Sequence, residues 1–247
     1  MITRFANPQR FVGLARWLSP LLGWGALALI GVGLYLSLLG SPADEEHGQT
    51  VRIMYVHVPA AWCAMAAYSG IAISSLIGFV WRHPLADMTA RNLALPGAAF
   101  TVLALATGSL WGKPDWGTYW QWDGRMTSVL VLLFIYIGYM AIWQVVNDRK
   151  RAARLAAIVA MVGWINIPVI KFSVEWWNSL HQGPTVSSPG APGLAPEFLT
   201  PLLLMALGYT LLLGWLAVRG MLGEIAAARA SRAPTPVSTA RIEALGE

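Results

Sequence analysis

Six long apolar stretches of this 247-residue chain contain no Asp, Glu, Lys or Arg, and they constrain its fold more than any other feature. Crossing the roughly 30 Å hydrocarbon core of a membrane takes about 20 helical residues. Residues 155–170 are the only stretch shorter than that, with 16 residues. The stem of Lys171 can extend this stretch, because a lysine buries its methylenes while its ammonium group reaches the interface. The stretches are 17–43, 53–81, 92–112, 126–147, 155–170 and 198–218.

The composition supports a membrane protein. Hydrophobic residues make up 56% of the chain and charged residues only 12%, whereas soluble domains carry about 25% charged residues. The apolar runs are continuous rather than alternating, which excludes a transmembrane β-barrel. We therefore predict an all-α integral membrane protein with six transmembrane helices in one domain, residues 1–223, followed by a tail, 224–247, that begins as a helix and becomes disordered. The expected spans are residues 20–39, 59–81, 93–111, 127–146, 154–172 and 198–218.

The distribution of Lys and Arg predicts the orientation. With six spans, both termini share one side of the membrane, and that side carries 13 of the 17 basic residues. By the positive-inside rule the termini are cytoplasmic. The first apolar run is too long for a cleaved signal peptide and is read as a retained span. The loops 40–56, 111–127 and 172–197 then face outward, with four basic residues on that side: Arg52, Lys113, Arg125 and Lys171.

The outward loop 111–127 is unusually rich in tryptophan. Its sequence, "WGKPDWGTYWQWDGRMT", is compatible with a belt at the membrane interface, where tryptophan is common. A belt explains less well Gly117 and the pair Asp123 and Arg125 within the cluster. The alternative is a platform for a planar ligand, on which indole faces stack and a guanidinium meets a carboxylate. Trp116 and Trp120 are spaced to share one helical face, with Trp122 offset.

Two of the four histidines are candidate ligands. His47 and His83 are most simply solvated loop residues. His57 precedes a proline that can open the second span, so it lies near the outer boundary. His181 is expected on the last turn of a fifth helix that projects beyond the membrane, with Trp177 one turn away on the same face.

Two neutral imidazoles on separate helices suit axial ligation of an iron porphyrin. They suit zinc poorly, because no third ligand has matching spacing. Two unrelated interfacial histidines remain the alternative at this point. Arg52 and Arg125 are candidate partners for porphyrin propionates. The chain has one cysteine, Cys63, and no C-x-x-C-H motif, so covalent c-type haem attachment is excluded. A nucleotide-binding loop is also missing, so any ATP-dependent step needs another subunit.

Three segments resemble a known family. "WGTYWQWD", followed by Arg125, resembles the WWD signature of haem-handling membrane proteins. "YVHVPAAW" and "PVIKFSVEWWNSLHQG" are similar to the two histidine segments of the CcmC family, the cytochrome c maturation protein C or haem exporter protein C. The likeness covers nearly the whole chain. CcmF and the CcsA-type subunits share the WWD loop, but CcmF is far longer, and the second histidine segment favours CcmC over both.

The resemblance implies a function as well as a site. His57 and His181 match the family's axial haem ligands. The haem-presenting WWD loop matches Trp116, Gly117, Trp120, Trp122, Asp123 and Arg125. The family holds non-covalent haem b at the periplasmic face of the bacterial inner membrane and delivers it to the chaperone CcmE. It works beside the CcmA ATPase and the membrane subunits CcmB and CcmD, and it is not an enzyme.

Two other functions compete with haem delivery. A permease for haem or another small molecule, as a subunit of an ABC-type exporter, would carry polar groups near the middle of its spans. Only Asn166 and Pro168 hint at such a pathway. A purely structural membrane subunit would use its tryptophans only as a belt.

Overall fold

Within the residues that the structure describes, six helical segments are long and apolar enough to cross a membrane. The computed structural model describes residues 8–177, 179, 181 and 193–232, and no β-strand occurs within these residues. The prediction of an all-α protein with six spans is confirmed. The elements are α1 (Pro8–Tyr35) with the π-helical turn η2 (Leu36–Gly40), the 3₁₀ turn η3 (Gln49–Ile53), α2 (Met54–Trp81), α3 (Pro84–Trp116), α4 (Gly124–Val145), α5 (Arg149–Gly163), α6 (Asn166–Trp176) and α7 (Pro196–Ala230).

Local sequence signals set several helix ends. Pro84 begins α3, where its fixed φ suits a first helical turn and its missing N–H is not needed. Gly117 ends α3 with a φ of 74°, a conformation that favours glycine. Asp123 and Asp148 cap α4 and α5 by accepting hydrogen bonds from backbone N–H groups of the first turn.

The fifth span is built from two helices, α5 and α6. The chain turns at Trp164 and Ile165 and then continues as α6. Pro168, in the first turn of α6, has no N–H to donate to the Trp164 carbonyl, and its ring would clash with that group in a straight helix. The N–H of Ile167 donates to Trp164 O instead, at 2.9 Å. This proline thus accounts for the break in the span.

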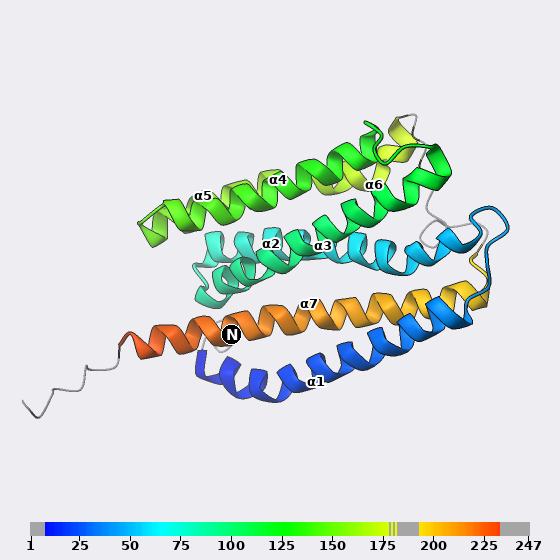
Figure 1. Cartoon of the computed structure of the whole chain (residues 1–247). Coiled ribbons are helices and arrows are strands. Elements are labelled where there is room, and N and C mark those ends of the chain that lie inside the picture. The colour runs from blue at the N-terminus through cyan, green and yellow to red at the C-terminus, as the bar shows by residue number, and fades with distance from the viewer. Residues whose placement is uncertain (1–7, 178, 180, 182–192, 233–247) are drawn as a thin grey trace, which may run out of the picture.

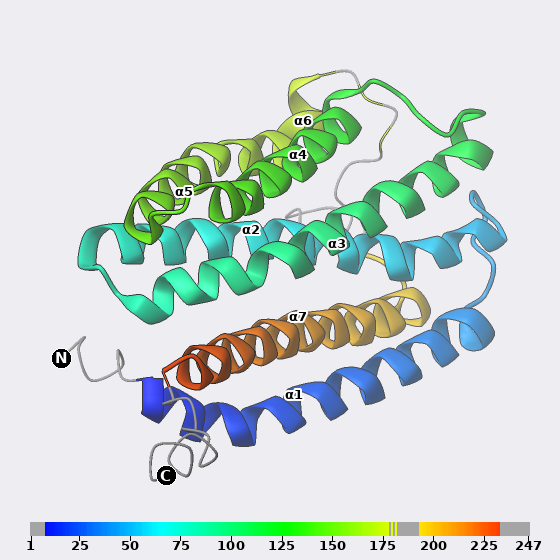
Figure 2. The same ribbon diagram turned by 60° about the vertical axis from the view of Figure 1, so that its left-hand side comes forward.

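The helices pack in three layers. α1 lies along α7, α7 also contacts α2 and α3, and α4 to α6 cover the opposite side (Figures 1 and 2). One buried cluster joins α2, α3 and α7 around Tyr55 and Met205. A second cluster joins α2, α3, α4, α5 and α6 around Tyr68 and Tyr136. The Tyr136 hydroxyl donates to Ala64 O at 2.7 Å. Gly97 makes room for this ring, because a Cβ there would lie 2.2 Å from the Tyr136 hydroxyl oxygen.

The beginning of α1 and the end of α7 lie at the same end of the bundle in both views (Figures 1 and 2). At this end, α7 runs on to Ala230, and Arg91 of α3 and Arg149 of α5 both pair with its Glu224. Residues 233–247, most of the expected tail, lie outside the described residues. The opposite end carries residues 117–123 between α3 and α4, and we call it the tryptophan-loop end.

Candidate functional site

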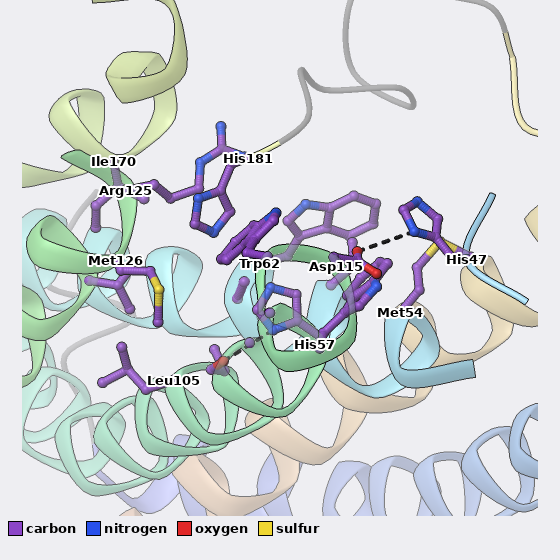
Figure 3. A pocket seen from close by; sticks show the side chains of 18 of the residues that line it. His47, Met54, His57, Trp62, Leu105, Asp115, Arg125, Met126, Ile170 and His181 are labelled. Atoms are coloured by element: carbon purple, nitrogen blue, oxygen red, sulfur yellow. Dashed lines mark hydrogen bonds and ion pairs between the residues drawn. The ribbon is translucent and has the colours of Figure 1, made fainter. Parts of the chain in front are cut away.

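A cavity of about 710 Å³ opens at the tryptophan-loop end, between α2, α3, α4, α6 and α7 (Figure 3). Pockets of roughly 300–1,000 Å³ are typical of sites for small molecules and cofactors. Figure 3 shows side chains from segments far apart in the sequence directed into this space. Aromatic rings, imidazoles and a guanidinium share its lining, notably His57, Trp62, Trp111, Trp116, Arg125 and His181.

His57, one of the two predicted ligands, is seated against α3. Its Nδ1 lies 3.0 Å from Ala104 O and 3.1 Å from Thr107 Oγ1. Because a carbonyl oxygen can only accept, Nδ1 carries the proton and Nε2 the lone pair. Gly108 lets the ring approach the helix, since a Cβ there would lie 3.0 Å from His57 Cε1. The local structure of α3 thus selects the tautomer that binds a metal through Nε2.

His181, the other predicted ligand, does not lie on a helix. α6 ends at Trp176, and Trp177 is extended, with φ −131° and ψ 153°. The expectation that Trp177 and His181 share a helical face is therefore wrong. Trp177 packs instead on the first residue of α4, where a Cβ added to Gly124 would lie 3.0 Å from the indole. This contact with another helix lies at the point where the chain leaves the helical path.

A carboxylate network holds His181. The imidazole Nδ1 donates to Asp123 Oδ2 at 2.6 Å, and the Ser179 hydroxyl donates to the same oxygen at 2.5 Å. The other oxygen, Asp123 Oδ1, accepts from the Met126 N–H at 2.8 Å and caps α4. The His181 N–H donates to Ser179 Oγ at 3.1 Å. Asp123 is 8% exposed. It therefore acts as an interior support for His181, and it does not line the cavity.

The protonation states follow from burial and hydrogen bonding. Burial opposes ionisation of Asp123, but hydrogen bonds from Ser179, Met126 and His181 outweigh it and lower the pKa of the carboxyl. Burial also lowers the pKa of His181 by more than the nearby Asp123 raises it. At neutral pH the pair is therefore a carboxylate and a neutral imidazole, with the proton on Nδ1 and the lone pair on Nε2.

Two indoles contact the two histidines directly. The rings of Trp116 and His181 have centroids 4.6 Å apart, and those of Trp111 and His57 are 6.0 Å apart. The prediction that Trp116 and Trp120 share a helical face is wrong, because α3 ends at Trp116. Trp120 packs against Trp122 in the loop, at 5.3 Å, and Trp122 is 74% exposed. Neither of these two indoles, nor Gly117, is part of the cavity lining.

The basic residues that line the cavity differ in part from the two predicted from the sequence, Arg52 and Arg125. Arg125 lines the cavity as expected, and Lys171 lines it too. Arg52 does not reach the lining; its guanidinium donates to Ser41 O at 3.4 Å. Two cations from α4 and α6 therefore border the space that also holds the imidazoles.

His47 is not the solvated loop residue that the sequence indicated. Its side chain is 12% exposed and lines the cavity, with Nδ1 3.1 Å from Asp115 Oδ2. A tight turn presents it: Asp44 Oδ1 accepts from the His47 N–H at 2.8 Å, and the Thr50 hydroxyl donates to His47 O at 2.7 Å. The run "DEEHGQT" carries the Asp and Gly of this turn, which was the available signal.

Several lining residues could have been found from helical spacing. On α2 the cavity face consists of residues three or four apart, a single helical stripe that includes the ring of Trp62. α3 contributes a matching stripe that includes Trp111. A stripe of this kind is also typical of ordinary core packing, so the sequence alone did not distinguish residues that line a cavity from residues that pack in the core. The stripe residues are Met54, His57, Val58, Ala61, Trp62 and Met65 on α2, and Ala104, Leu105, Gly108, Trp111 and Gly112 on α3.

Comparisons with known proteins identify the family of this chain. The family model described as Heme exporter protein C matches residues 1–235. A Heme exporter protein C from Bradyrhizobium diazoefficiens is 52% identical over 220 residues, covering 89% of this chain and 83% of the relative. Its namesake from Escherichia coli is 41% identical over 218 residues, covering 88% of each. The Paracoccus denitrificans relative of that name is 37% identical, covering 85% of this chain and 88% of its own length. The chain belongs to the CcmC family of haem exporter proteins.

Proposed function

We propose that this protein binds haem in the cavity at its tryptophan-loop end, with His57 and His181 as axial ligands, and delivers it to the periplasmic chaperone CcmE. One observation carries the proposal: two imidazoles from separate segments border one cavity, each with Nδ1 engaged by the protein. Each ring therefore keeps its Nε2 lone pair for a metal, as a histidine that ligates haem iron must.

The rest of the lining suits a porphyrin. The cavity volume of about 710 Å³ is in the range for a cofactor-sized molecule. Trp111 and Trp116 offer ring surfaces to a flat plate, and Arg125 and Lys171 offer cations to its two propionates. Haem b held without a covalent bond fits the sequence, which has a single cysteine. Haem is here the cargo, and binding followed by transfer needs no catalytic residues.

The membrane placement of this function rests on charge. The excess of basic residues around both termini supports an inner-membrane protein with cytoplasmic termini and a periplasmic tryptophan loop. In that orientation the exposed Trp122 and its neighbour Trp120 face the compartment of the acceptor CcmE, while Trp116 faces the haem. A CcmA ATPase with the membrane subunits CcmB and CcmD would supply the ATP-driven step, for which this sequence has no nucleotide-binding loop.

The two residues that hinted at a permease pathway take part in helix packing and helix geometry. The side-chain amide of Asn166 donates to Ser128 O at 2.8 Å, joining α6 to α4. Pro168 accounts for the break between α5 and α6. Both residues that hinted at a pathway therefore have structural roles.

Single substitutions of the two histidines test the proposal. His57→Ala and His181→Ala are expected to lower the haem content of the purified protein and to change its Soret band. His83→Ala is a matched control, because His83 precedes α3 at the end of the bundle away from the cavity. Unchanged haem content and an unchanged spectrum in both cavity variants would contradict the axial-ligand assignment.

A further inference from the structure

The two proposed axial ligands are held by acceptors of different charge. The Nδ1 of His57 is bonded to two neutral groups, the Ala104 carbonyl and the Thr107 hydroxyl. That hydroxyl donates its own proton to Leu103 O at 2.7 Å, so it can accept from the imidazole. The Nδ1 of His181 donates instead to the Asp123 carboxylate at 2.6 Å.

This difference changes the iron-binding nitrogen on the far side of each ring. A carboxylate that accepts the Nδ1 proton pulls it away from the ring and increases the electron density on Nε2, which raises the basicity of the ligand. Charge-assisted hydrogen bonds are also shorter and stronger than neutral ones. A carbonyl and a hydroxyl have a weaker effect. Two identical side chains therefore become unequal donors.

Asp123 is held by hydrogen bonds to both of its carboxylate oxygens. Its Oδ2 receives both the imidazole and the Ser179 hydroxyl, and its Oδ1 receives the Met126 N–H at the start of α4. The residue is 8% exposed, so water has little access to these oxygens. A buried carboxylate with both oxygens occupied is a rigid support, and its charge is weakly screened.

We propose that Asp123 is a positioning residue that makes His181 the stronger of two unequal axial ligands and favours ferric over ferrous haem iron. The inference rests on the proposed function. A more electron-rich axial nitrogen stabilises the higher oxidation state, and hydrogen bonding to an axial ligand is one of the protein's means of setting a haem potential. His57, held by neutral acceptors, is the weaker ligand and the one that releases the iron more readily.

The same residue joins the ligand to the loop. Asp123 is the last residue before α4, directly after Trp120 and Trp122 in the chain. A displacement of the loop that moves Asp123 also removes the carboxylate from His181. The strength of one axial bond is therefore tied to the position of the exposed loop.

Resonance Raman spectroscopy of ferrous haem in the full-length protein compares the two ligands directly. His57→Ala leaves His181 as the axial histidine, and His181→Ala leaves His57. We expect the iron–histidine stretching frequency to be higher in His57→Ala, because the carboxylate strengthens that bond. Equal frequencies, or the reverse order, overturn the inference while the axial assignment stands. If neither variant shows an iron–histidine band, the proposed ligands themselves are wrong.

Asp123→Asn tests the carboxylate without removing the helix cap, because asparagine caps helices as well as aspartate does. We expect a higher midpoint potential and about a 10–100-fold loss of haem affinity, the usual effect of removing such a support. Asp148→Asn is the matched control: Asp148 caps α5 in the same way and lies at the other end of the bundle. A potential in Asp123→Asn equal to those of wild type and Asp148→Asn overturns the inference.

Discussion

The Nδ1 atom of His181 lies 2.6 Å from Oδ2 of Asp123, the residue that caps α4 and closes the tryptophan loop. The contact joins a segment that follows α6 to the beginning of α4, 58 residues away in the chain. It gives the aspartate of the WWD signature a structural role. The loop that carries Trp120 and Trp122 is thereby joined to His181 by a hydrogen bond.

The contact between His181 and Asp123 predicts that the stability of the haem-free protein depends on pH. Burial lowers the pKa of His181 in the folded state. Below the ordinary histidine pKa of about 6.5, the unfolded chain therefore takes up a proton that the folded protein excludes, and stability falls with decreasing pH. The unfolding temperature should decrease as the pH is lowered from 6.5 through the folded pKa of His181, and less so in His181→Asn. Parallel curves for the two proteins would contradict this account.

Gly108 should be needed for the position of His57. A Cβ at this position would lie 3.0 Å from His57 Cε1, so the two further methyl groups of valine would push the imidazole away from α3. We expect Gly108→Val to lose most of its haem, measured by absorbance after purification. Gly138→Val is the control, because no neighbouring atom lies within 4 Å of a Cβ at Gly138. Full haem content in Gly108→Val would show that His57 does not need this close approach to α3.

Arg125 and Lys171 should act through the propionates of haem. Removing both cations with Arg125→Gln and Lys171→Gln is expected to weaken haem binding by about tenfold or more, because hydrogen bonds to charged groups contribute roughly 1.5–3 kcal/mol. The same double variant should bind haem dimethyl ester as well as wild type does, since the esterified side chains carry no charge. An equal loss of affinity for haem and for haem dimethyl ester would show that the two cations do not act through the propionates.

His47 lines the cavity but is not expected to ligate the iron in the resting complex. Its pairing with Asp115 holds the turn around residues 44–48 against the end of α3. His47→Ala should therefore keep the low-spin haem spectrum, with a stability loss of at most about 1 kcal/mol for the partly exposed pair. A change to high-spin haem in this variant would identify His47 as a ligand.

The tryptophans should separate into two functional groups. Trp116 contacts His181 inside the cavity, whereas Trp122 is 74% exposed. Trp116→Ala is expected to lower haem affinity, and Trp122→Ala to leave affinity unchanged while slowing transfer to CcmE. Haem titration and a transfer assay with purified CcmE measure the two effects. Reversed effects would contradict the assignment of the inner ring to haem and the outer ring to the acceptor.

Much of the fold could be predicted from the sequence, because its signals are local. Runs without charged residues located all six spans, and Gly117 and Pro84 are ordinary signals for the end and the start of a helix. His57 and Arg125 could be placed near helix beginnings for the same reason. A residue on a regular helix inherits its position from its neighbours, so its approximate place follows from spacing.

The site was harder to predict where distant segments decide the structure. His181 was expected on a helix that continues past Trp177, whereas α6 ends at Trp176 and Trp177 packs on Gly124 of another helix. Asp123 was expected to be part of the haem-presenting loop, and only the fold brings Ser179 and His181 to it. Contacts between residues more than 50 positions apart leave no periodic pattern in the sequence.

Electron paramagnetic resonance of the ferric haem-loaded protein tests the central claim most directly. Two axial imidazoles produce a low-spin signal, and loss of either one should convert the iron to high spin. We predict a low-spin spectrum for wild type and for His83→Ala, and a high-spin spectrum for both His57→Ala and His181→Ala. A low-spin signal that persists unchanged in both of the last two variants would show that haem is not held between these histidines.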